Sequence, residues 1–133
     1  MSVEKIHHVA FAVEDLDEGI KTYERFFNAR VELRDRLESQ GVDAAYLRVG
    51  ADRIELLAPI GEDTPVGRFI KRRGPGMHHV AFEVDDVSKA IQALLEAGAV
   101  LIDLKPRLGL GGHTVAFVHH ESQHGVLIEV VSP

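Results

Sequence analysis

Two histidines and two glutamates recur at equivalent positions of an internal repeat. Residues 6–20 (IHHVAFAVEDLDEGI) and 77–91 (MHHVAFEVDDVSKAI) are identical at eight of fifteen positions when they are aligned at an offset of 71. The end of each half also matches, since IELLAP at 54–59 aligns with IEVVSP at 128–133. Each half therefore begins with a histidine-bearing segment and ends with a glutamate-bearing one. Imidazole and carboxylate groups are both ligands of divalent metal ions, so the repeat can supply four ligands to one ion.

Strand periodicity selects one histidine from each His-His pair. Side chains alternate between the two faces of a strand, so only one histidine of each pair can face a given site. His8 and His79 share their faces with mostly small side chains, which leave room for a ligand, whereas the bulky apolar residues lie on the opposite faces. We therefore predict that His8 and His79 face the site and that His7 and His78 have structural roles.

Glu55 and Glu129 each lie in the middle of an apolar strand pattern. A single such glutamate is readily explained as an edge-strand residue that faces solvent. Burial of a carboxylate is costly unless it is paired or metal-bound, and its recurrence at matching repeat positions favours ligation. Two imidazoles and two carboxylates suit Co²⁺, Mn²⁺, Ni²⁺, Fe²⁺ or Zn²⁺. Open coordination positions would accept a bidentate oxygen ligand such as a 1,3-dicarbonyl, whose enolate a Lewis acid stabilises.

The hydrophobic periodicity predicts a βαβββ unit in each half. The first unit comprises a strand at 6–13, a helix ending near residue 28, and strands at 30–35, 43–49 and 52–57. The second comprises a strand from 77, a helix at about 86–97, and strands at 100–104, 114–119 and 126–131; a short helix at 66–72 lies in the linker. Helix caps are predicted at Asp15 or Asp17 and at Asp86 or Ser88.

These elements predict an α+β fold in which two tandem βαβββ modules form a curved mixed sheet around a central metal site. We expect a single domain over residues 1–133, with module one at about 4–59, a linker at about 60–75 and module two at about 76–133. Cysteine is absent, which excludes disulfides, a thiol nucleophile and thiolate ligation.

The net charge of −6 argues against nucleic acid as a partner. The lack of a long apolar run or signal-peptide pattern predicts a cytoplasmic protein that does not enter a membrane. One basic cluster is either a solvated helix face or a contact for a phosphate-bearing substrate tail; its members are Arg68, Lys71, Arg72 and Arg73, with Lys105 and Arg107 later in the chain.

Two further features near the C-terminus are ambiguous from the sequence. The glycine-rich segment 109–112 lacks the Lys-Ser/Thr pattern of a phosphate-binding P-loop, and it is either a hairpin connection or a mobile flap. The remaining histidines are interpreted as surface residues, namely His113, His119, His120 and His124.

The duplicated unit, with histidine in its first strand and glutamate in its last, resembles the vicinal oxygen chelate superfamily, which includes glyoxalase I, fosfomycin resistance proteins and extradiol dioxygenases. Within it, the segments IHHVAFAV, IELLAP, DTPVGRFIKRRG and GVLIE look most like the methylmalonyl-CoA epimerase family. The resemblance covers essentially the whole chain. It implies an isomerase that interconverts (2R)- and (2S)-methylmalonyl-CoA by α-proton abstraction through a metal-stabilised enolate.

The same resemblance implies metal ligation by His8, Glu55, His79 and Glu129, an acyl-CoA substrate and a homodimer. Co²⁺ is the favoured ion, with Mn²⁺, Ni²⁺ or Zn²⁺ as alternatives. Some members of the family carry a glutamate, proposed as a base, at the position of Ala44 in this chain.

We expect Glu129 to be one proton-transfer base and Glu55 or Glu38 to be the other. The pseudo-twofold relation of the repeats is expected to place Glu55 and Glu129 on opposite sides of the metal. Two alternatives remain, a lactoylglutathione lyase resembling glyoxalase I and a non-catalytic small-molecule-binding or resistance protein of the same fold. Retention of four ligands favours an enzyme over the binding protein.

Overall fold

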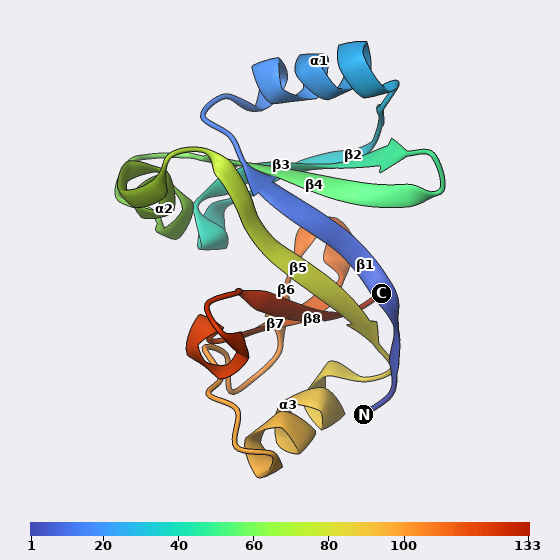
Figure 1. Cartoon of the computed structure of the whole chain (residues 1–133), viewed down its shortest axis with the longest axis vertical. Coiled ribbons are helices and arrows are strands. Elements are labelled where there is room, and N and C mark those ends of the chain that lie inside the picture. Colours follow the sequence, from blue (N-terminus) through green and yellow to red (C-terminus); the bar gives the residue numbers. More distant parts are fainter. The chain divides into compact units, whose positions relative to one another are not determined.

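The computed structural model describes all 133 residues, and its elements follow the repeat (Figure 1). The first half consists of β1 (Val3–Ala12), α1 (Leu16–Phe27), β2 (Arg30–Leu37), the 3-10 helix η1 (Glu38–Gln40), β3 (Val42–Val49) and β4 (Asp52–Pro59), followed by α2 (Pro65–Arg73). The second half consists of β5 (Gly76–Val84), α3 (Val87–Glu96), β6 (Arg107–Leu108), η2 (Leu110–Gly112), β7 (Thr114–Val118), η3 (His120–Gln123) and β8 (Ile128–Ser132). The predicted α+β class is confirmed.

The chain forms two compact units whose boundaries differ from those of the sequence modules. The terminal unit comprises residues 1–8 and 79–133, and the central unit comprises residues 9–78. Strands β1 and β5 are each divided between the units, so the first eight residues pack with the second half of the chain. The Ser2 amide donates to Oδ1 of Asp85 at 3.0 Å, and the Asp85 amide donates to the Ser2 carbonyl at 3.2 Å.

In the central unit the strand order is β2-β3-β4-β1. β3 pairs antiparallel with both β2 and β4, whereas β1 pairs parallel with β4. Helix α1 covers one face of these strands (Figure 1), and its residues Leu16 and Ile20 are buried against Leu47 and Leu56. The helix begins after Asp15, whose carboxylate accepts a hydrogen bond from a backbone amide of the first turn at 3.0 Å.

In the terminal unit the strands follow the order β5-β8-β7-β6. β5 pairs parallel with β8, and the other pairs are antiparallel, so both units have the mixed pairing that the repeat predicts. Helix α3 begins after its cap residue Asp86 and packs its residues Ala90 and Ile91 against Val84 and Val130. None of the helices is long and apolar enough to cross a membrane.

The strand predicted at residues 100–104 is wrong, because this segment forms only an isolated bridge between Leu101 and Val118. The side chain of Asp103 takes the place of a backbone hydrogen bond that a regular strand would make there. The Phe117 amide donates to the carboxylate of Asp103 at 2.8 Å, and the amides of Ile102 and Asp103 both reach the Phe117 carbonyl. Regular pairing to β7 resumes with the two-residue strand β6.

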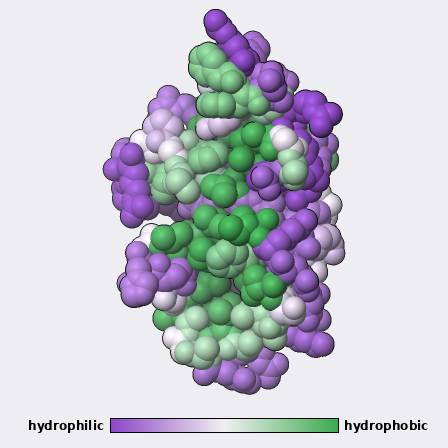
Figure 2. All heavy atoms as spheres, turned by 45° about the vertical axis from the view of Figure 1, so that its right-hand side comes forward, coloured by the Kyte–Doolittle hydropathy of each residue, from purple (hydrophilic) through white to green (hydrophobic).

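Large apolar side chains are exposed among the charged ones (Figure 2). Phe26 and Phe27 of α1 are 66% and 59% exposed. They lie in the last turn of the helix, where the buried stripe has ended, and Phe27 packs instead on the ring of Tyr23 at 5.7 Å. Exposed aromatic surface of this kind is typical of contacts with another chain, and the homodimer stays a prediction.

Candidate metal centre

In each half of the chain, the candidate glutamate ligand lies opposite an alanine of the neighbouring parallel strand. In the terminal unit, Glu129 of β8 lies in register with Ala81 of β5. In the central unit, Glu55 of β4 lies in register with Ala10 of β1. Each alanine follows the predicted histidine ligand by two residues, so it lies on the same face of its strand. The repeat is therefore preserved in strand pairing and register as well as in residue type.

Three of the four predicted ligands converge within the terminal unit. His8, His79 and Glu129 each offer a ligand atom within 4.8 Å of the other two. Nε2 of His8 lies 3.2 Å from Nε2 of His79 and 3.4 Å from Oε1 of Glu129, while Nε2 of His79 lies 3.8 Å from Oε2 of Glu129. All three residues are buried, with exposures of 1%, 3% and 6%.

This geometry fits a divalent metal ion. Ligand atoms about 2.1 Å from one ion, at the angles of tetrahedral or octahedral coordination, lie roughly 3.0–3.4 Å apart. The observed separations of 3.2, 3.4 and 3.8 Å lie in or just above that range. The donor set is two imidazole nitrogens and a carboxylate without sulfur, which suits the first-row divalent ions named above. Three buried polar groups that face one another are also expensive to desolvate, and a shared cation would offset that cost.

Glu55, the fourth predicted ligand, belongs to the central unit. Its side chain is buried, with 5% exposure, and the residue lies between Ala10 and Tyr46 in the pairing of β1, β4 and β3. Burial is consistent with a ligand and rules out the solvent-facing edge-strand interpretation. On the same strand, the guanidinium of Arg53 lies over the Tyr46 ring at 5.2 Å. Ligation by Glu55 stays a prediction.

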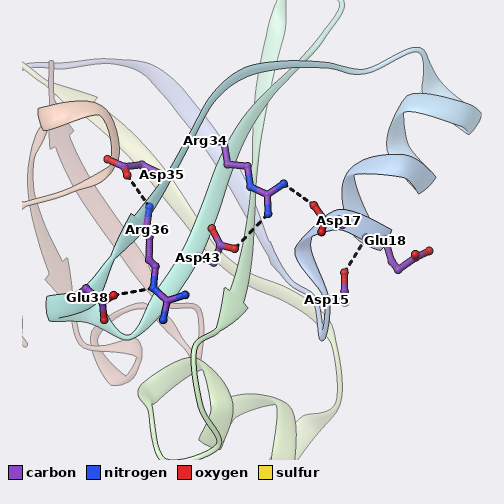
Figure 3. A network of polar contacts seen from close by, with 8 residues as sticks. All are labelled: Asp15, Asp17, Glu18, Arg34, Asp35, Arg36, Glu38 and Asp43. Atoms are coloured by element: carbon purple, nitrogen blue, oxygen red, sulfur yellow. Dashed lines mark hydrogen bonds and ion pairs between the residues drawn. The ribbon is translucent and has the colours of Figure 1, made fainter.

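Glu38, one of the candidate bases, lies in solvent in η1 of the central unit. Its Oε1 accepts from Nε of Arg36 at 2.7 Å, and the two side chains are 73% and 55% exposed (Figure 3). Ala44, where some epimerases carry a glutamate, is fully buried in β3. The first half therefore offers one exposed, ion-paired carboxylate and one buried carboxylate, Glu55, as candidate bases. The role of Glu38 as a base stays a prediction.

His7 has a closer connection to the site than its predicted structural role implied. Its Nδ1 lies 2.8 Å from Nδ1 of His8, and the residue is 4% exposed. His113, which was expected at the surface, is partly buried and packs edge-on against the His7 ring at 5.1 Å. The repeated His-His pair in the sequence was the one signal that could have predicted the contact between His7 and His8. Strand alternation argued against it, because neighbouring side chains point to opposite faces. His78, at the equivalent position of the second half, packs its ring against Phe69 at 4.8 Å.

The central unit also contains a cavity of about 550 Å³ beside helix α2. It is lined by Glu14, Pro59, Gly61, Glu62, Gly67, Ile70 and Lys71. Helix α2 carries three basic residues in its last turn, where they interact favourably with the helix dipole. Among the cluster, Arg68 pairs with Asp63 at 3.0 Å and the Arg73 guanidinium lies over Phe69.

The chain matches known proteins over nearly its whole length. Residues 7–117 match the model of the Glyoxalase/Bleomycin resistance protein/Dioxygenase superfamily. The mitochondrial methylmalonyl-CoA epimerase of Dictyostelium discoideum is 34% identical over 98% of this chain and 79% of that protein. An ethylmalonyl-CoA/methylmalonyl-CoA epimerase of Cereibacter sphaeroides is also 34% identical, over 95% of this chain and 96% of its own length.

The fold is also similar to that of solved methylmalonyl-CoA epimerase structures. A Streptomyces coelicolor methylmalonyl-CoA epimerase variant in complex with 2-nitronate-propionyl-CoA superimposes with a TM-score of 0.95 at 33% identity, covering 98% of this chain and 95% of that one.

Proposed function

Because the chain belongs to the Glyoxalase/Bleomycin resistance protein/Dioxygenase superfamily, we propose that it interconverts the (2R) and (2S) epimers of methylmalonyl-CoA. The observation that carries the proposal is the buried group of His8, His79 and Glu129 in a chain whose full-length relatives are named as epimerases of this substrate. The reaction needs removal of the proton on C2 and its return to the opposite face. A carboxylate can remove this proton as a general base, and a neighbouring metal ion can stabilise the resulting negative charge as a Lewis acid.

His8, His79 and Glu129 would hold the metal ion, with Glu55 as the proposed fourth ligand. When bound, a divalent ion supplies Lewis acidity that disperses the negative charge developing on the oxygens of a β-carboxyl thioester. Co²⁺ is the ion we favour, with Mn²⁺, Ni²⁺ or Zn²⁺ as alternatives, because all of these accept mixed nitrogen and oxygen ligands.

Glu129 is the proposed base on one face of the substrate. The C2–H bond breaks, the proton moves to the carboxylate, and the electron pair delocalises into the thioester carbonyl. A second carboxylic acid, at Glu55 or Glu38, then returns a proton to the other face. The complex of the Streptomyces coelicolor relative with a nitronate supports this chemistry, since a nitronate is planar at the carbon that corresponds to C2 and carries its negative charge on oxygen atoms, as an enolate does.

The basic face of helix α2 is the proposed contact for the phosphates of coenzyme A. Lys71 lines the cavity of the central unit, and Arg68 and Arg72 are exposed on the same helix. A cavity of about 550 Å³ is within the size range of small-molecule sites. The four cationic side chains of this helix match the anionic nucleotide end of the substrate.

Exchange of the C2 proton provides the direct test. The protein, loaded with Co²⁺ or Mn²⁺ and incubated with methylmalonyl-CoA in D₂O, should wash out the α-proton signal while interconverting the epimers. Chelation should stop the exchange, and metal should restore it. Retention of the α-proton together with isomerisation of the methylglyoxal–glutathione adduct would replace the epimerase by a glyoxalase I-like enzyme. Binding without turnover of either substrate would indicate a non-catalytic member of the superfamily.

Metal content tests the ligand assignment separately from activity. His8→Ala and His79→Ala should each lower the bound metal by an order of magnitude or more in a folded protein. His124→Ala, at an exposed position of the same unit, is the matched control and should retain the metal. Full occupancy in both ligand variants by elemental analysis would refute the assignment.

A further inference from the structure

Both ring nitrogens of His8 face a polar partner. Nε2 points to the candidate metal ligands, at 3.2 Å from His79 and 3.4 Å from Glu129. Nδ1 lies 2.8 Å from Nδ1 of His7, a separation within hydrogen-bonding distance. One proton must lie between the two Nδ1 atoms for this contact to be a hydrogen bond, and the residue that carries it determines what His8 can do at Nε2.

A neutral imidazole has one N–H donor and one acceptor nitrogen. If His8 carries its proton on Nδ1 and donates to His7, then Nε2 presents a lone pair toward His79 and Glu129. If His7 donates instead, His8 must carry its proton on Nε2, which blocks ligation. We propose that His7 is a positioning residue for metal binding, which accepts a hydrogen bond from Nδ1–H of His8 and so holds Nε2 of His8 in the ligating state.

The surroundings of His7 support this role. Its ring is buried, with 4% exposure, and stands at 76° to the His8 ring with centroids 5.0 Å apart. The ring of His113 also packs edge-on against the His7 ring, with centroids 5.1 Å apart. The backbone of His113 is itself tied, since its carbonyl accepts from the Gly109 amide at 2.8 Å. A buried ring packed by two neighbours has few alternative rotamers, so it presents its acceptor in one direction.

The ring of the other histidine ligand, His79, packs at 87° against Phe117, with centroids 5.2 Å apart. A hydrogen bond to the distal nitrogen of a ligating histidine orients the ring and raises its basicity, and loss of such a partner typically weakens metal binding 10- to 100-fold.

Substitutions at His7 separate the hydrogen bond from simple packing. His7→Phe keeps a ring but removes the acceptor, and it should weaken Zn²⁺ binding about 10- to 100-fold, measured by competition with a chromophoric chelator. His7→Asn places an amide oxygen near the former Nδ1 and should bind Zn²⁺ within a few fold of the wild type. His120→Phe, which alters an exposed histidine of the same unit, should leave affinity unchanged. Equal affinity of His7→Phe and the wild type would overturn the proposal.

A spectroscopic measurement on the wild type decides the proposal even if a variant does not fold. Nitrogen-15 NMR of the Zn²⁺-loaded protein should show the shared proton on Nδ1 of His8 and none on Nδ1 of His7. A proton on Nδ1 of His7 would refute the inference.

The inference rests on the proposed metal site but fails separately from the proposed activity. If the wild type binds Zn²⁺ tightly with the proton on Nδ1 of His8, the inference holds even if the protein exchanges no C2 proton. A wild type that binds no Zn²⁺ would refute the metal site and the inference together.

Discussion

Glu129 offers two oxygens, and each is nearest to a different histidine. Oε1 lies 3.4 Å from His8 and Oε2 lies 3.8 Å from His79. One oxygen can therefore serve as a ligand while the other accepts a proton. The side chain is only 8% exposed, so water competes little for either oxygen. Ligation and proton transfer are consequently separable by substitution.

The first prediction is that Glu129→Gln retains metal better than Glu129→Ala but loses turnover. An amide keeps an oxygen ligand while it removes the basicity, so the rate should fall by roughly 10²- to 10⁴-fold, the loss typical of a general base. Metal analysis and the C2-proton exchange rate measure the two effects independently.

Glu38→Gln is the comparison for Glu129, because Glu38 is the exposed, ion-paired candidate. We expect it to change exchange less than Glu129→Gln does. Near wild-type turnover in metal-replete Glu129→Gln, together with a collapse in Glu38→Gln, would show that Glu129 is only a ligand.

At the scale of elements, the structure distinguishes residues that the sequence left as equal alternatives. Asp86 rather than Ser88 caps α3, since its carboxylate accepts from the Lys89 amide at 3.1 Å. The same holds in the first half, where Asp15 caps α1 and Asp17 instead pairs with Arg34 of β2 at 2.6 Å (Figure 3). The Arg34 hydrogen bond lowers the pKa of Asp17.

The second prediction concerns this cap. Asp86→Ala should lower the free energy of unfolding by about 0.5–2 kcal/mol, because it leaves a backbone amide of the first turn without its acceptor. Ser88→Ala, in the first turn of the same helix, should change it by less than about 0.5 kcal/mol. Denaturant unfolding measures both, and equal effects would contradict the assignment of the cap.

The third prediction concerns the strand pairing of the central unit. Glu32 of β2 accepts from Arg53 of β4 and from Arg48 of β3, each at 2.7 Å, and therefore links three strands. The hydrogen bond from Arg53 is the main cause that holds the pKa of Glu32 below its ordinary value of 4.5. A lowered folded-state pKa stabilises the protein above the unfolded pKa, and this contribution is lost as the pH falls through the folded pKa.

Glu32→Gln should therefore be less stable than the wild type at pH 7, and the difference should shrink as the pH falls below about 4.5. Glu96→Gln, at the exposed end of α3, is the control for removal of a carboxylate. Chemical denaturation at a series of pH values measures the effect. A difference that stayed constant down to pH 3 would show that the ion pairs do not contribute.

At the scale of the whole molecule, the candidate metal ligands come from distant parts of the chain. His8 lies in β1, His79 in β5 and Glu129 in β8, and all belong to the terminal unit. A metal ion bound there would tie the N-terminal segment to the second half of the sequence. It would join segments about 50 to 70 residues apart in the sequence, and an ion that binds only the folded state stabilises that state.

The fourth prediction is that metal binding stabilises the fold in proportion to its affinity. Zn²⁺ at 100 times its dissociation constant should add about 2.7 kcal/mol to the free energy of unfolding. Thermal unfolding with and without Zn²⁺ measures the shift, and a chelator should reverse it. His8→Ala should show little shift at the same concentration, and an undiminished shift in this variant would place the ion elsewhere.

The sequence by itself determined the repeat, the superfamily, the α+β class, most strands and helices, and the residues His8, His79 and Glu129 that the structure brings together. These features are local or repeated. Strand alternation, helix periodicity and capping act over a few residues, and duplication marks equivalent positions whatever lies between them.

Only the tertiary structure decided the membership of the two compact units, the irregular path of residues 100–104, and the contact between His7 and His8. The unit boundary follows from the docking of the first eight residues beside β5, more than 70 positions away in the chain. The side chain of Asp103 replaces a strand contact that the hydrophobic pattern favoured. Such outcomes depend on which distant groups satisfy each backbone amide and each buried ring nitrogen, and local spacing does not specify those partners.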